Sequence, residues 1–527
     1  MNRYCNPMCR RQFFLKFCFY FLATLTSIST ALYIATIYLK RIFGSVSIEQ
    51  ILFNISTSEA CSFELLLFYA IRAIPYVLAI LAMTFAIFYI VNKLLVVDSV
   101  KEVFSPIINL LKLIWAKLNG IRRAIDERPI VLLAVILLAA LISTGKTVDR
   151  RLKVRDFLAR TDTPFVAENY ARLDPNSAIL PAGKPKNLIV IFSESLEWGY
   201  ADESIYGRNL IRELQASTND GLYLRGYKKT AGGRFTLDGI SAQTLGMPLT
   251  QVPIDIHSEK SKNAFGVVLR KSPSIFNLLN NAGYKTAFFS GTSRDFTHKA
   301  DFLKVHGFIE TYFEEDWLEK GFKLDDNNRG SWSFNDRFLL SRFTDYLNKL
   351  NGKAPFALVF ETVDTHAPYG WTPMNERHYN DARDAFLYSS KLLAGFINWA
   401  RTQSWFKDTV IVVVGDHPWQ DHVNDFSMLT KKSSNREIFA TIINSEVKTL
   451  NIQDCGYSAM DIAPTILDAM GIKFRSQWKS GESTTRIGLG TSLFSNEKNL
   501  VCTYGVQDFT MKLDAYSDFY NSLHEVD

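Results

Sequence analysis

The stretch Val412–His417 constrains the fold of this chain more than any other. Its run of β-branched apolar residues stops at Gly415, and a carboxylate and an imidazole follow at once. Such a run is typical of a buried strand in a parallel sheet, and open α/β sheets bind ligands just beyond the carboxyl ends of their strands. Asp416 and His417 therefore lie where a functional site is expected. A capped strand end with a hydrogen-bonded histidine is the structural alternative.

The chain beyond residue 187 repeats the order strand, loop, helix. Repeats of this kind predict an α/β fold with a doubly wound, mostly parallel sheet. The other expected strands are 188–192, 284–289 and 356–360, and the expected helices are 338–350, 386–401 and 458–470.

Two of these strands are also followed by residues suited to chemistry. Glu194 comes just after the strand 188–192, and His366 lies beyond the strand 356–360. Because the carboxyl ends of parallel strands meet at one edge of a sheet, we expect these side chains to converge with Asp416 and His417. For Glu194, a place in a helix N-cap cluster is the structural alternative.

The loop after the strand 284–289 carries three basic side chains, Arg294, His298 and Lys299. Arginine and lysine can hold an anionic head group, so this loop is a candidate substrate contact. Solvated surface charge explains the same residues without a ligand.

Thr236 follows a glycine-rich turn and lies where a helix is expected to begin. A helix N-terminus offers free N–H groups and a partial positive charge. That environment would stabilise an alkoxide on Thr236 and the oxygens of a phosphoryl group. The structural alternative is a threonine that only caps the helix.

Together, Glu194, Thr236, Asp416 and His417 supply the oxygen and nitrogen ligands of a divalent cation. Mn²⁺ is the favoured ion, with Zn²⁺ and Mg²⁺ as alternatives. Metal coordination lowers the pKa of a hydroxyl, which would make Thr236 a nucleophile. His366 could hydrogen-bond the substrate or protonate the leaving group.

The N-terminal third is rich in apolar and aromatic residues, which indicates a membrane and not nucleic acid as its partner. We expect membrane spans at 13–39, 73–91 and 129–142, with an amphipathic segment at 107–118. The stretch 63–91 could instead cross twice, although Arg72 near its middle argues against that. Basic residues at the N-terminus and between the last two spans predict that both regions are cytoplasmic.

Three crossings would place the rest of the chain outside the cytoplasm. The expected organisation is a transmembrane anchor at 1–145, a proline-containing stalk at 146–186 and an extracytoplasmic catalytic domain at 187–527. Cys455 and Cys502 are the only cysteines of that last domain and could pair in an oxidising compartment.

Four motifs resemble, in their order, those of the sulfatase/alkaline-phosphatase superfamily. They are 192–197 (Phe-Ser-Glu-Ser-Leu-Glu), the Gly-x-x-Thr turn at Thr236, 365–368 (Thr-His-Ala-Pro) and 415–417 (Gly-Asp-His). The segments 301–308 and 461–467 are similar too. The branch that the chain resembles is that of the membrane phosphoglycerol transferases, such as lipoteichoic acid synthase and the osmoregulated periplasmic glucan phosphoglycerol transferase.

The resemblance implies a metal site of Glu194, Thr236, Asp416 and His417, with Thr236 as nucleophile. Lys299 matches a basic contact to phosphoglycerol, and His366 matches the substrate histidine. The chain departs from lipoteichoic acid synthase where Thr297 and His298 replace an aromatic residue, and where three crossings replace five. It also lacks the Cys-x-Pro-x-Arg motif, which argues against sulfate-ester hydrolysis through formylglycine.

The function that we expect is metal-dependent transfer of phosphoglycerol from a phospholipid, phosphatidylglycerol, to an envelope glycan or glycolipid through a phospho-threonine intermediate. Phosphoethanolamine transfer and a non-catalytic membrane sensor that binds glycans are the alternatives. The expected location is the inner membrane of a bacterium, with several crossings and the catalytic domain facing the periplasm. The sequence leaves the acceptor, the native metal and the oligomeric state open.

Overall fold

The computed structural model describes residues 25, 29, 33, 34, 141–150, 162–250, 268–294, 296, 299–350, 355–367, 370–420, 424–478 and 481–524. The chain divides into two compact units, and the second, which includes Ala159–Asp527, holds nearly all of the described residues. This second unit carries the α/β fold.

The expected membrane anchor lies largely outside the described residues. Only residues 25, 29, 33, 34, 141 and 142 of the expected spans are described, and the amphipathic segment 107–118 is not. None of the helices in the described ranges combines the length and apolar character needed to cross a bilayer. The number of crossings therefore stays a prediction.

A seven-stranded sheet forms the centre of the second unit within the described residues. The five strands β7, β2, β6, β4 and β5 run parallel to one another, whereas β8 pairs antiparallel with both β7 and β3. The sequence prediction of a mostly parallel α/β sheet is thus confirmed. In spatial order the strands are β3 (Leu222–Tyr223), β8 (Ala440–Ile443), β7 (Thr409–Gly415), β2 (Asn187–Ser193), β6 (Phe356–Glu361), β4 (Lys285–Phe289) and β5 (Glu310–Tyr312).

The register of the central strands aligns their carboxyl ends. Ser193 of β2 lies opposite Gly415 of β7, and Phe192 lies opposite Glu361 of β6. The residues that follow these three strands therefore emerge side by side at one edge of the sheet. This alignment brings Glu194 next to Asp416 although they are far apart in sequence.

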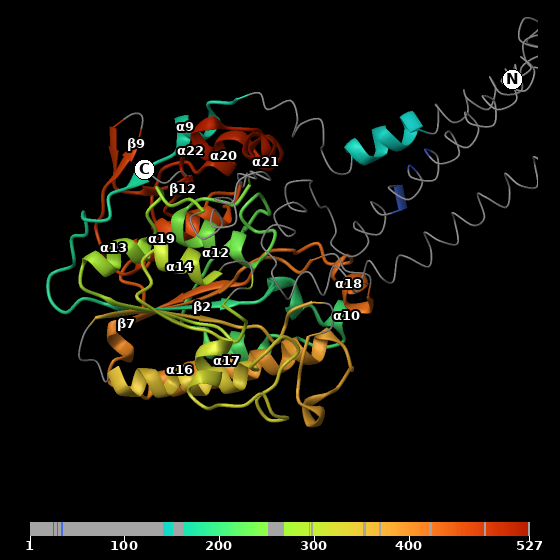
Figure 1. Ribbon diagram of the computed structural model, residues 1–527. Coiled ribbons are helices and arrows are strands. Elements are labelled where there is room, and N and C mark those ends of the chain that lie inside the picture. Colours follow the sequence, from blue (N-terminus) through green and yellow to red (C-terminus); the bar gives the residue numbers. More distant parts are fainter. Residues whose placement is uncertain are drawn as a thin grey trace, which may run out of the picture. The chain divides into compact units, whose positions relative to one another are not determined.

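Helices cover both faces of the sheet (Figure 1). Side chains of β2 alternate between the two apolar cores, Val190 and Phe192 facing one and Ile189 and Ile191 the other. This alternation is the two-residue period of a strand, and both faces are apolar because both are covered. The first core includes α12 (Thr236–Leu245), α13 (Ile275–Asn281), α14 (Lys299–Val305) and α19 (Ile462–Ala469); the second includes α16 (Asp336–Leu350) and α17 (Ala382–Arg401).

The predicted helices are confirmed with small changes at their ends. The helix expected at 386–401 is α17, which begins at Ala382. Its start is fixed by a capping box, in which Asp381 caps the helix and the Asp384 side chain accepts a hydrogen bond from the Asp381 backbone. The helix expected at 458–470 consists of the 3-10 turn η6 (Ala459–Asp461) followed by α19.

Residues from the expected stalk pack into the same unit. The helix α9 (Phe165–Asn169) contributes Phe165 and Val166 to the first core, and β1 (Arg172–Leu173) pairs with β9 (Ser476–Trp478).

Cys455 and Cys502 form a disulfide, with their Cα atoms 5.2 Å apart. The pairing that the sequence left open is thus present in the structure.

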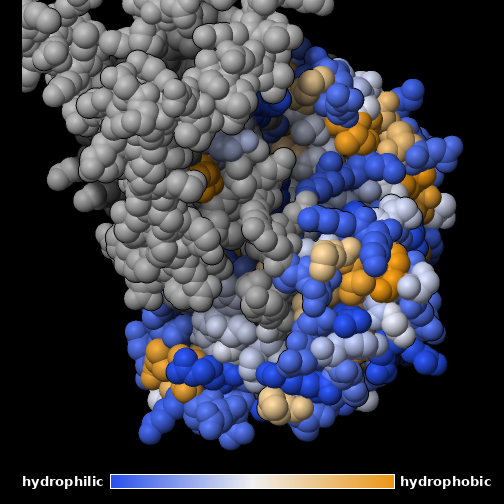
Figure 2. Space-filling model, turned by 90° about the vertical axis from the view of Figure 1, so that its right-hand side faces the viewer, coloured by the Kyte–Doolittle hydropathy of each residue, from blue (hydrophilic) through white to orange (hydrophobic). Residues whose placement is uncertain are grey.

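The remaining elements complete the unit around these layers. On the described part of the face shown in Figure 2, hydrophilic residues predominate and hydrophobic ones form small separate groups. The elements are η1 (Trp198–Ala201), α10 (Glu203–Tyr206), α11 (Arg212–Ser217), α15 (Glu314–Glu319), η4 (Met374–Glu376), η5 (Phe406–Asp408), α18 (Asp425–Thr430), β10 (Gly481–Ser483), β11 (Arg486–Ile487), β12 (Gly490–Thr491), α20 (Leu500–Tyr504), α21 (Val506–Asp514) and α22 (Asp518–Ser522).

Candidate functional site

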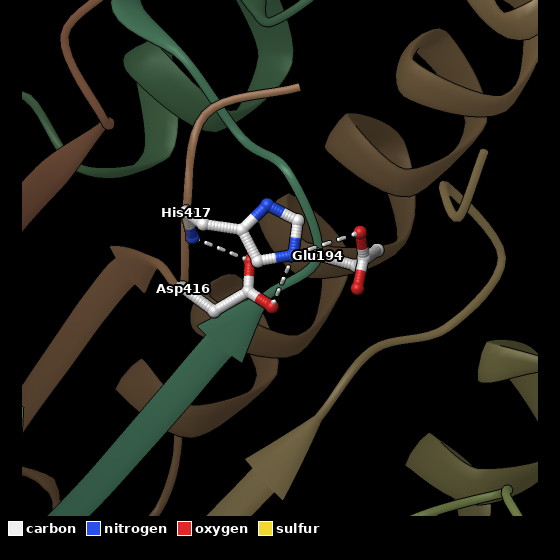
Figure 3. A group of neighbouring side chains, drawn as sticks. All are labelled: Glu194, Asp416 and His417. Atoms are coloured by element: carbon white, nitrogen blue, oxygen red, sulfur yellow. Dashed lines mark hydrogen bonds and ion pairs between the residues drawn. The ribbon is translucent and has the colours of Figure 1, made fainter. Parts of the chain in front are cut away.

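Glu194, Asp416 and His417 meet at the carboxyl ends of β2 and β7 (Figure 3). One ligand atom of each residue lies within 4.8 Å of the other two, and all three side chains are buried. His417 Nε2 is 3.4 Å from Asp416 Oδ2 and 3.6 Å from Glu194 Oε1. The parallel register of the sheet thus brings together two carboxylates and an imidazole, as the sequence led us to expect.

Hydrogen bonds fix one side of Asp416 and His417 and leave the other side open. Asp416 Oδ1 accepts the backbone N–H groups of Ser195 and His417, both at 2.8 Å. His417 Nδ1 lies 2.9 Å from the carbonyl oxygen of Pro418, which can only accept, so Nδ1 carries the proton. His417 Nε2 is therefore the ring nitrogen that faces the two carboxylates.

Thr236 approaches the same group from the first turn of α12. Its hydroxyl donates to Glu194 Oε2 at 3.2 Å, while the other oxygen of Glu194 accepts the Ser195 hydroxyl at 2.6 Å. The N-cap position of α12 is Phe235, so the Thr236 hydroxyl does not cap its helix. The structural alternative, a threonine that only caps the helix, is thus not what the structure shows, and the role of Thr236 as nucleophile stays a prediction.

Ser195 has a backbone φ of 55°, in the left-handed region. A non-glycine residue there costs about 1–3 kcal/mol, and such strain persists only where surrounding contacts fix it. Here the backbone N–H of Ser195 binds Asp416, and its hydroxyl binds Glu194. Ser195 thus links the two carboxylates.

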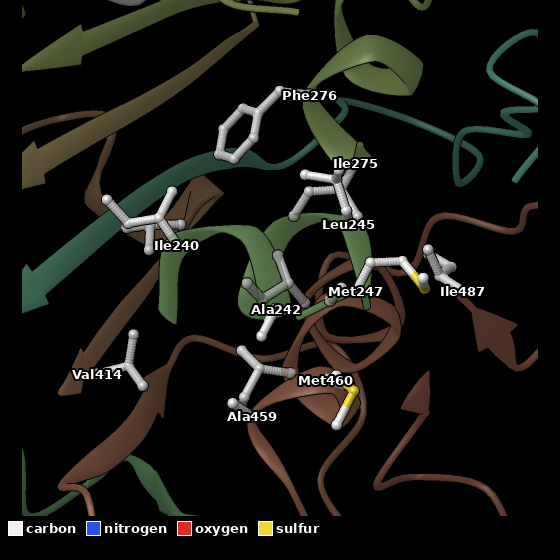
Figure 4. Packing of buried hydrophobic residues seen from close by; sticks show 14 of the residues in the cluster. Ile240, Ala242, Leu245, Met247, Ile275, Phe276, Val414, Ala459, Met460 and Ile487 are labelled. Atoms are coloured by element: carbon white, nitrogen blue, oxygen red, sulfur yellow. The ribbon is translucent and has the colours of Figure 1, made fainter. Parts of the chain in front are cut away.

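Close packing holds α12 against the end of β7. A Cβ atom at Gly239 would collide with the backbone carbonyl of Asp416, so only glycine permits this approach. The buried Gln243 amide donates to the carbonyl oxygens of Gly415 at 3.0 Å and Asp416 at 3.1 Å. Apolar residues of α12, such as Ile240 and Leu245, anchor the helix in the first core (Figure 4).

Asp238 organises the glycine-rich turn before Thr236. Its buried carboxylate accepts the backbone N–H groups of Gly232, Arg234 and Leu249 and pairs with the Arg234 guanidinium. These bonds fix the turn that presents Thr236. The sequence did not predict these roles of Asp238 and Gln243, because an acid or amide inside a helix does not indicate which distant backbone groups it will bind.

Burial and mutual charge shift the protonation of the group. Burial, with the neighbouring Glu194 charge, raises the pKa of Asp416 to about 7. Burial opposes ionisation of Glu194, but the imidazoles of His417 and His366 and two hydroxyl donors lower its pKa overall. Burial opposes charge on His417 as well, yet the two carboxylates raise its pKa on balance.

His366 lies beyond the end of β6, on the same edge of the sheet. Its Nδ1 is 2.7 Å from the Ala367 carbonyl oxygen, which orients the ring and leaves Nε2 for another partner. The ring of Trp332 packs edge-on against it at 4.5 Å. The Thr365 hydroxyl donates to the Glu194 carbonyl oxygen at 2.7 Å and ties this loop to the site.

The basic residues of the loop after β4 are held by acidic partners. The Arg294 guanidinium lies 3.1 Å from Asp316, and Lys299 is buried with Nζ at 2.6 and 2.8 Å from the two oxygens of Glu361. Both Arg294 and Lys299 are thus ion-paired, and neither is only a charge solvated at the surface. His298 lies outside the described residues, and substrate contacts by all three remain predictions.

The donor set at the sheet edge fits a divalent cation. Asp416 Oδ2 and His417 Nε2 are buried and have no hydrogen-bond partner among the described residues. Unpaired buried polar atoms are costly, and a cation between them would satisfy both. Oxygen and nitrogen ligands of this kind suit Mn²⁺, Zn²⁺ or Mg²⁺.

A family model described as Sulfatase matches residues 186–472, more than half of the chain. The chain belongs to the sulfatase family. The matched range contains Glu194, Thr236, His366, Asp416 and His417, so the group at the sheet edge lies within the family's own domain.

Curated relatives of this sulfatase-family chain carry the name phosphoglycerol transferase I. The protein from Escherichia coli O6:K15:H31 (strain 536) is 31% identical over 294 residues, which cover 54% of this chain and 37% of the relative. The protein from Salmonella arizonae is 31% identical over 320 residues, 59% of this chain and 39% of the relative. The matches thus span less than two fifths of these relatives' own length.

Solved structures with a similar arrangement include the lipoteichoic acid synthase LtaP from Listeria monocytogenes, at 16% identity and a TM-score of 0.47. That similarity covers 68% of this chain and 97% of LtaP. Another is the integral membrane protein lipooligosaccharide phosphoethanolamine transferase A from Neisseria meningitidis, at 15% identity and a TM-score of 0.45. That similarity covers 84% of this chain and 83% of the Neisseria protein.

Proposed function

We propose that this chain is a metal-dependent phosphotransferase that moves phosphoglycerol from phosphatidylglycerol to an envelope glycan or glycolipid. The observation that carries the proposal is the Thr236 hydroxyl bonded to Glu194, beside Asp416 Oδ2 and His417 Nε2, which have no hydrogen-bond partner among the described residues. A hydroxyl so placed is suited to attack an electrophilic phosphorus. The relatives named phosphoglycerol transferase I support phosphoglycerol as the group transferred.

Glu194, Asp416, His417 and Thr236 are the proposed metal site, with Mn²⁺ favoured over Zn²⁺ and Mg²⁺. When bound, the cation supplies positive charge that lowers the pKa of the Thr236 hydroxyl and neutralises charge on the phosphoryl oxygens. The first N–H groups of α12 add a partial positive charge at the same place.

In the first proposed step Thr236 Oγ1 forms a bond to phosphorus, and the bond from phosphorus to the diacylglycerol oxygen breaks. The hydroxyl proton leaves along the hydrogen bond to Glu194 and passes to solvent. The departing oxygen takes a proton from Nε2 of a His366 imidazolium, whose Nδ1–H donates to the Ala367 carbonyl oxygen and so orients the ring.

In the second step an acceptor hydroxyl attacks the phosphorus of phospho-threonine. His366 recovers its proton from that hydroxyl, and Thr236 regains one from solvent as its bond to phosphorus breaks. Lys299 is a proposed contact to the transferred group: a lysine ammonium has three donors, and the two oxygens of Glu361 engage two of them. Arg294 and His298 are further candidates in the same loop.

The proposed location is the inner membrane of a bacterium, with the catalytic domain in the periplasm. An apolar N-terminal third suits an enzyme whose donor is a membrane lipid. The disulfide between Cys455 and Cys502 supports an oxidising compartment for the domain.

The test is diacylglycerol release from labelled phosphatidylglycerol by the purified full chain with Mn²⁺. The proposal expects release by the native protein and by Thr402→Ala, an exposed threonine at the end of α17, and none by Thr236→Ala. Release that survives Thr236→Ala would refute the assignment of the nucleophile.

Phosphatidylethanolamine as a second donor in the same assay separates the two transferase alternatives. Preference for that lipid would replace phosphoglycerol by phosphoethanolamine while keeping the mechanism. A protein that binds no stoichiometric metal and turns over neither lipid would instead be a sensor without catalytic activity.

A further inference from the structure

Glu197 is a buried carboxylate that no step proposed above uses. It follows β2, and its backbone forms an isolated β-bridge with Ile438. Its side chain makes a bidentate ion pair with Arg436, whose Nε is 2.6 Å from Oε2 and whose terminal nitrogen is 2.9 Å from Oε1. Paired contacts of this kind hold both planar groups in one orientation. The ion pair is therefore a rigid feature of the fold.

This ion pair holds the backbone of Trp419 at two points. Glu197 Oε1 accepts the Trp419 N–H at 2.8 Å, and Arg436 donates to the Trp419 carbonyl oxygen at 2.7 Å. The buried Trp419 indole donates to the Ser427 hydroxyl at 3.0 Å, which anchors the same residue through its side chain. The loop after β7 is thus fixed two residues beyond His417.

A single peptide group connects Glu197 to His417. It joins Pro418 to Trp419, and its N–H is the group that donates to Glu197. Its carbonyl oxygen lies 2.9 Å from His417 Nδ1. A carboxylate bound to the N–H of a peptide polarises that peptide and makes its carbonyl oxygen a stronger acceptor. The charge of Glu197 thus supports the hydrogen bond that keeps a proton on Nδ1.

Nε2 of His417 faces acceptors of its own, which compete for that proton (Figure 3). It is 3.4 Å from Asp416 Oδ2 and 3.6 Å from Glu194 Oε1. On the other side, the Ser195 hydroxyl is 3.4 Å from Nδ1 and donates to Glu194, so toward the ring it can only accept. A neutral imidazole has one N–H, on either nitrogen. The competition between the Pro418 carbonyl and the two carboxylates decides which nitrogen carries it.

His366 provides an internal comparison, because it lacks the connection to a carboxylate. Its Nδ1 also lies against the carbonyl oxygen of the following residue, Ala367, at 2.7 Å. The next residue in the sequence is Pro368, which has no N–H that a carboxylate could bind. Support through a peptide N–H is thus open to His417 and closed to His366.

We propose that Glu197 is a positioning residue for His417. Acting through the Pro418–Trp419 peptide, it keeps the neutral imidazole in the Nδ1–H tautomer against the pull of the two carboxylates. Nε2 then faces the site without a proton, as a nitrogen that binds a cation must. The benefit to cation binding rests on the proposed function, whereas the tautomer itself does not.

The test observes the tautomer directly in the full chain, with its eight histidines labelled with ¹⁵N and its metal removed by EDTA. Long-range ¹⁵N–¹H correlation spectra at alkaline pH, where the imidazole is neutral, show which nitrogen carries the proton. The signals that disappear in His417→Gln identify His417. We expect the native chain to show the Nδ1–H tautomer, and a proton on Nε2 would overturn the inference without any further variant.

Two double variants then isolate the hydrogen bond to the peptide. Glu197→Leu with Arg436→Met removes the acceptor and both charges, so no buried charge is left unpaired. Glu197→Gln with Arg436→Met keeps an amide oxygen that can accept the Trp419 N–H. We expect the first to move the proton toward Nε2 and to raise the Kd for Mn²⁺, measured by calorimetry, about tenfold. The second should restore the Nδ1–H tautomer and a Kd close to the native value.

Arg486→Met is the matched control, because it removes a buried guanidinium paired with Glu497 on β11. It should leave the His417 tautomer and the Kd for Mn²⁺ unchanged, and the His366 signals should stay the same in all of these proteins. The native tautomer in the Glu197→Leu, Arg436→Met variant would overturn the inference, whatever the stability of that variant. An equal tautomer shift in the control would do so as well. A native chain that binds no Mn²⁺ but shows the expected tautomers would refute the proposed metal site and leave the role of Glu197 standing.

Discussion

Thr236 donates a hydrogen bond of 3.2 Å to Oε2 of Glu194, although the two residues are 42 positions apart. Glu194 follows the central strand β2, and Thr236 begins the helix α12. The bond therefore joins the end of a central strand to a helix N-terminus. Both elements hold the Thr236 hydroxyl, the candidate nucleophile, in position.

Glu194→Gln should lower the affinity for Mn²⁺ by at least tenfold, whereas Thr236→Ala should change it by less. The neutral amide removes one of two buried negative charges, but the alanine removes only a hydroxyl that is already bonded to Glu194. Metal content after equilibrium dialysis, measured by inductively coupled plasma mass spectrometry, checks the contrast. Equal metal content in the native and Glu194→Gln proteins would remove Glu194 from the site.

Gln243→Leu should destabilise the domain by about 2 kcal/mol, because it leaves the carbonyl oxygens of Gly415 and Asp416 without their shared donor. It should also weaken cation binding, since Asp416 loses its backbone support. Thermal unfolding with and without Mn²⁺ measures both effects. Gln477→Leu, at an exposed position on β9, serves as the control and should unfold like the native protein.

Without metal, stability should fall as pH rises from about 4 to about 7. The folded pKa of Asp416 is raised to about 7, above the unfolded value of about 3.9, so its contribution is full below pH 4 and lost through pH 7. Burial raises the pKa of Asp336 to about 7 and adds to the trend. Unfolding midpoints in EDTA between pH 4 and pH 8 should decline less in Asp416→Asn than in the native protein.

Adding Mn²⁺ should reverse that decline, because a cation and a proton compete for the same Asp416 oxygen and His417 nitrogen. The rise in unfolding midpoint on adding Mn²⁺ should thus be larger at pH 8 than at pH 5. A metal-induced rise that is the same at both pH values would show that the cation binds elsewhere.

Reduction of the disulfide between Cys455 and Cys502 should cost about 2–4 kcal/mol, because the bond closes a long loop of the unfolded chain. Cys455→Ser with Cys502→Ser should lower the unfolding midpoint under oxidising conditions and make it insensitive to reductant. Thiol titration of the denatured native protein should gain two reactive groups on reduction; no gain would contradict the pairing.

The parallel centre of the fold was predictable because its strands are continuous apolar runs. Val412–Val414 and the run 188–192 show this pattern, and the polar residues after them indicated the site edge. The antiparallel edge was not predictable: β8 is four residues long, and nothing in Ala440–Ile443 indicates strand direction.

The residue types that make up the site were predictable, but the residues that hold them in place were not. Gln243, Asp238 and Ser195 act through partners that only the fold brings near, so no local pattern reveals them. Lys299 shows the same limit, because its pairing with Glu361 joins residues 62 positions apart. The stalk prediction included residues 165–173, which carry apolar side chains that the fold buries.

The most direct test of the account is peptide mass spectrometry of the native chain after brief incubation with phosphatidylglycerol and Mn²⁺ without acceptor. The account predicts a phosphoglycerol adduct on the peptide that contains Thr236, and its loss when a glycan acceptor is added. Diacylglycerol released with no adduct on Thr236, or an adduct on another residue, would contradict the claim that this threonine is the nucleophile.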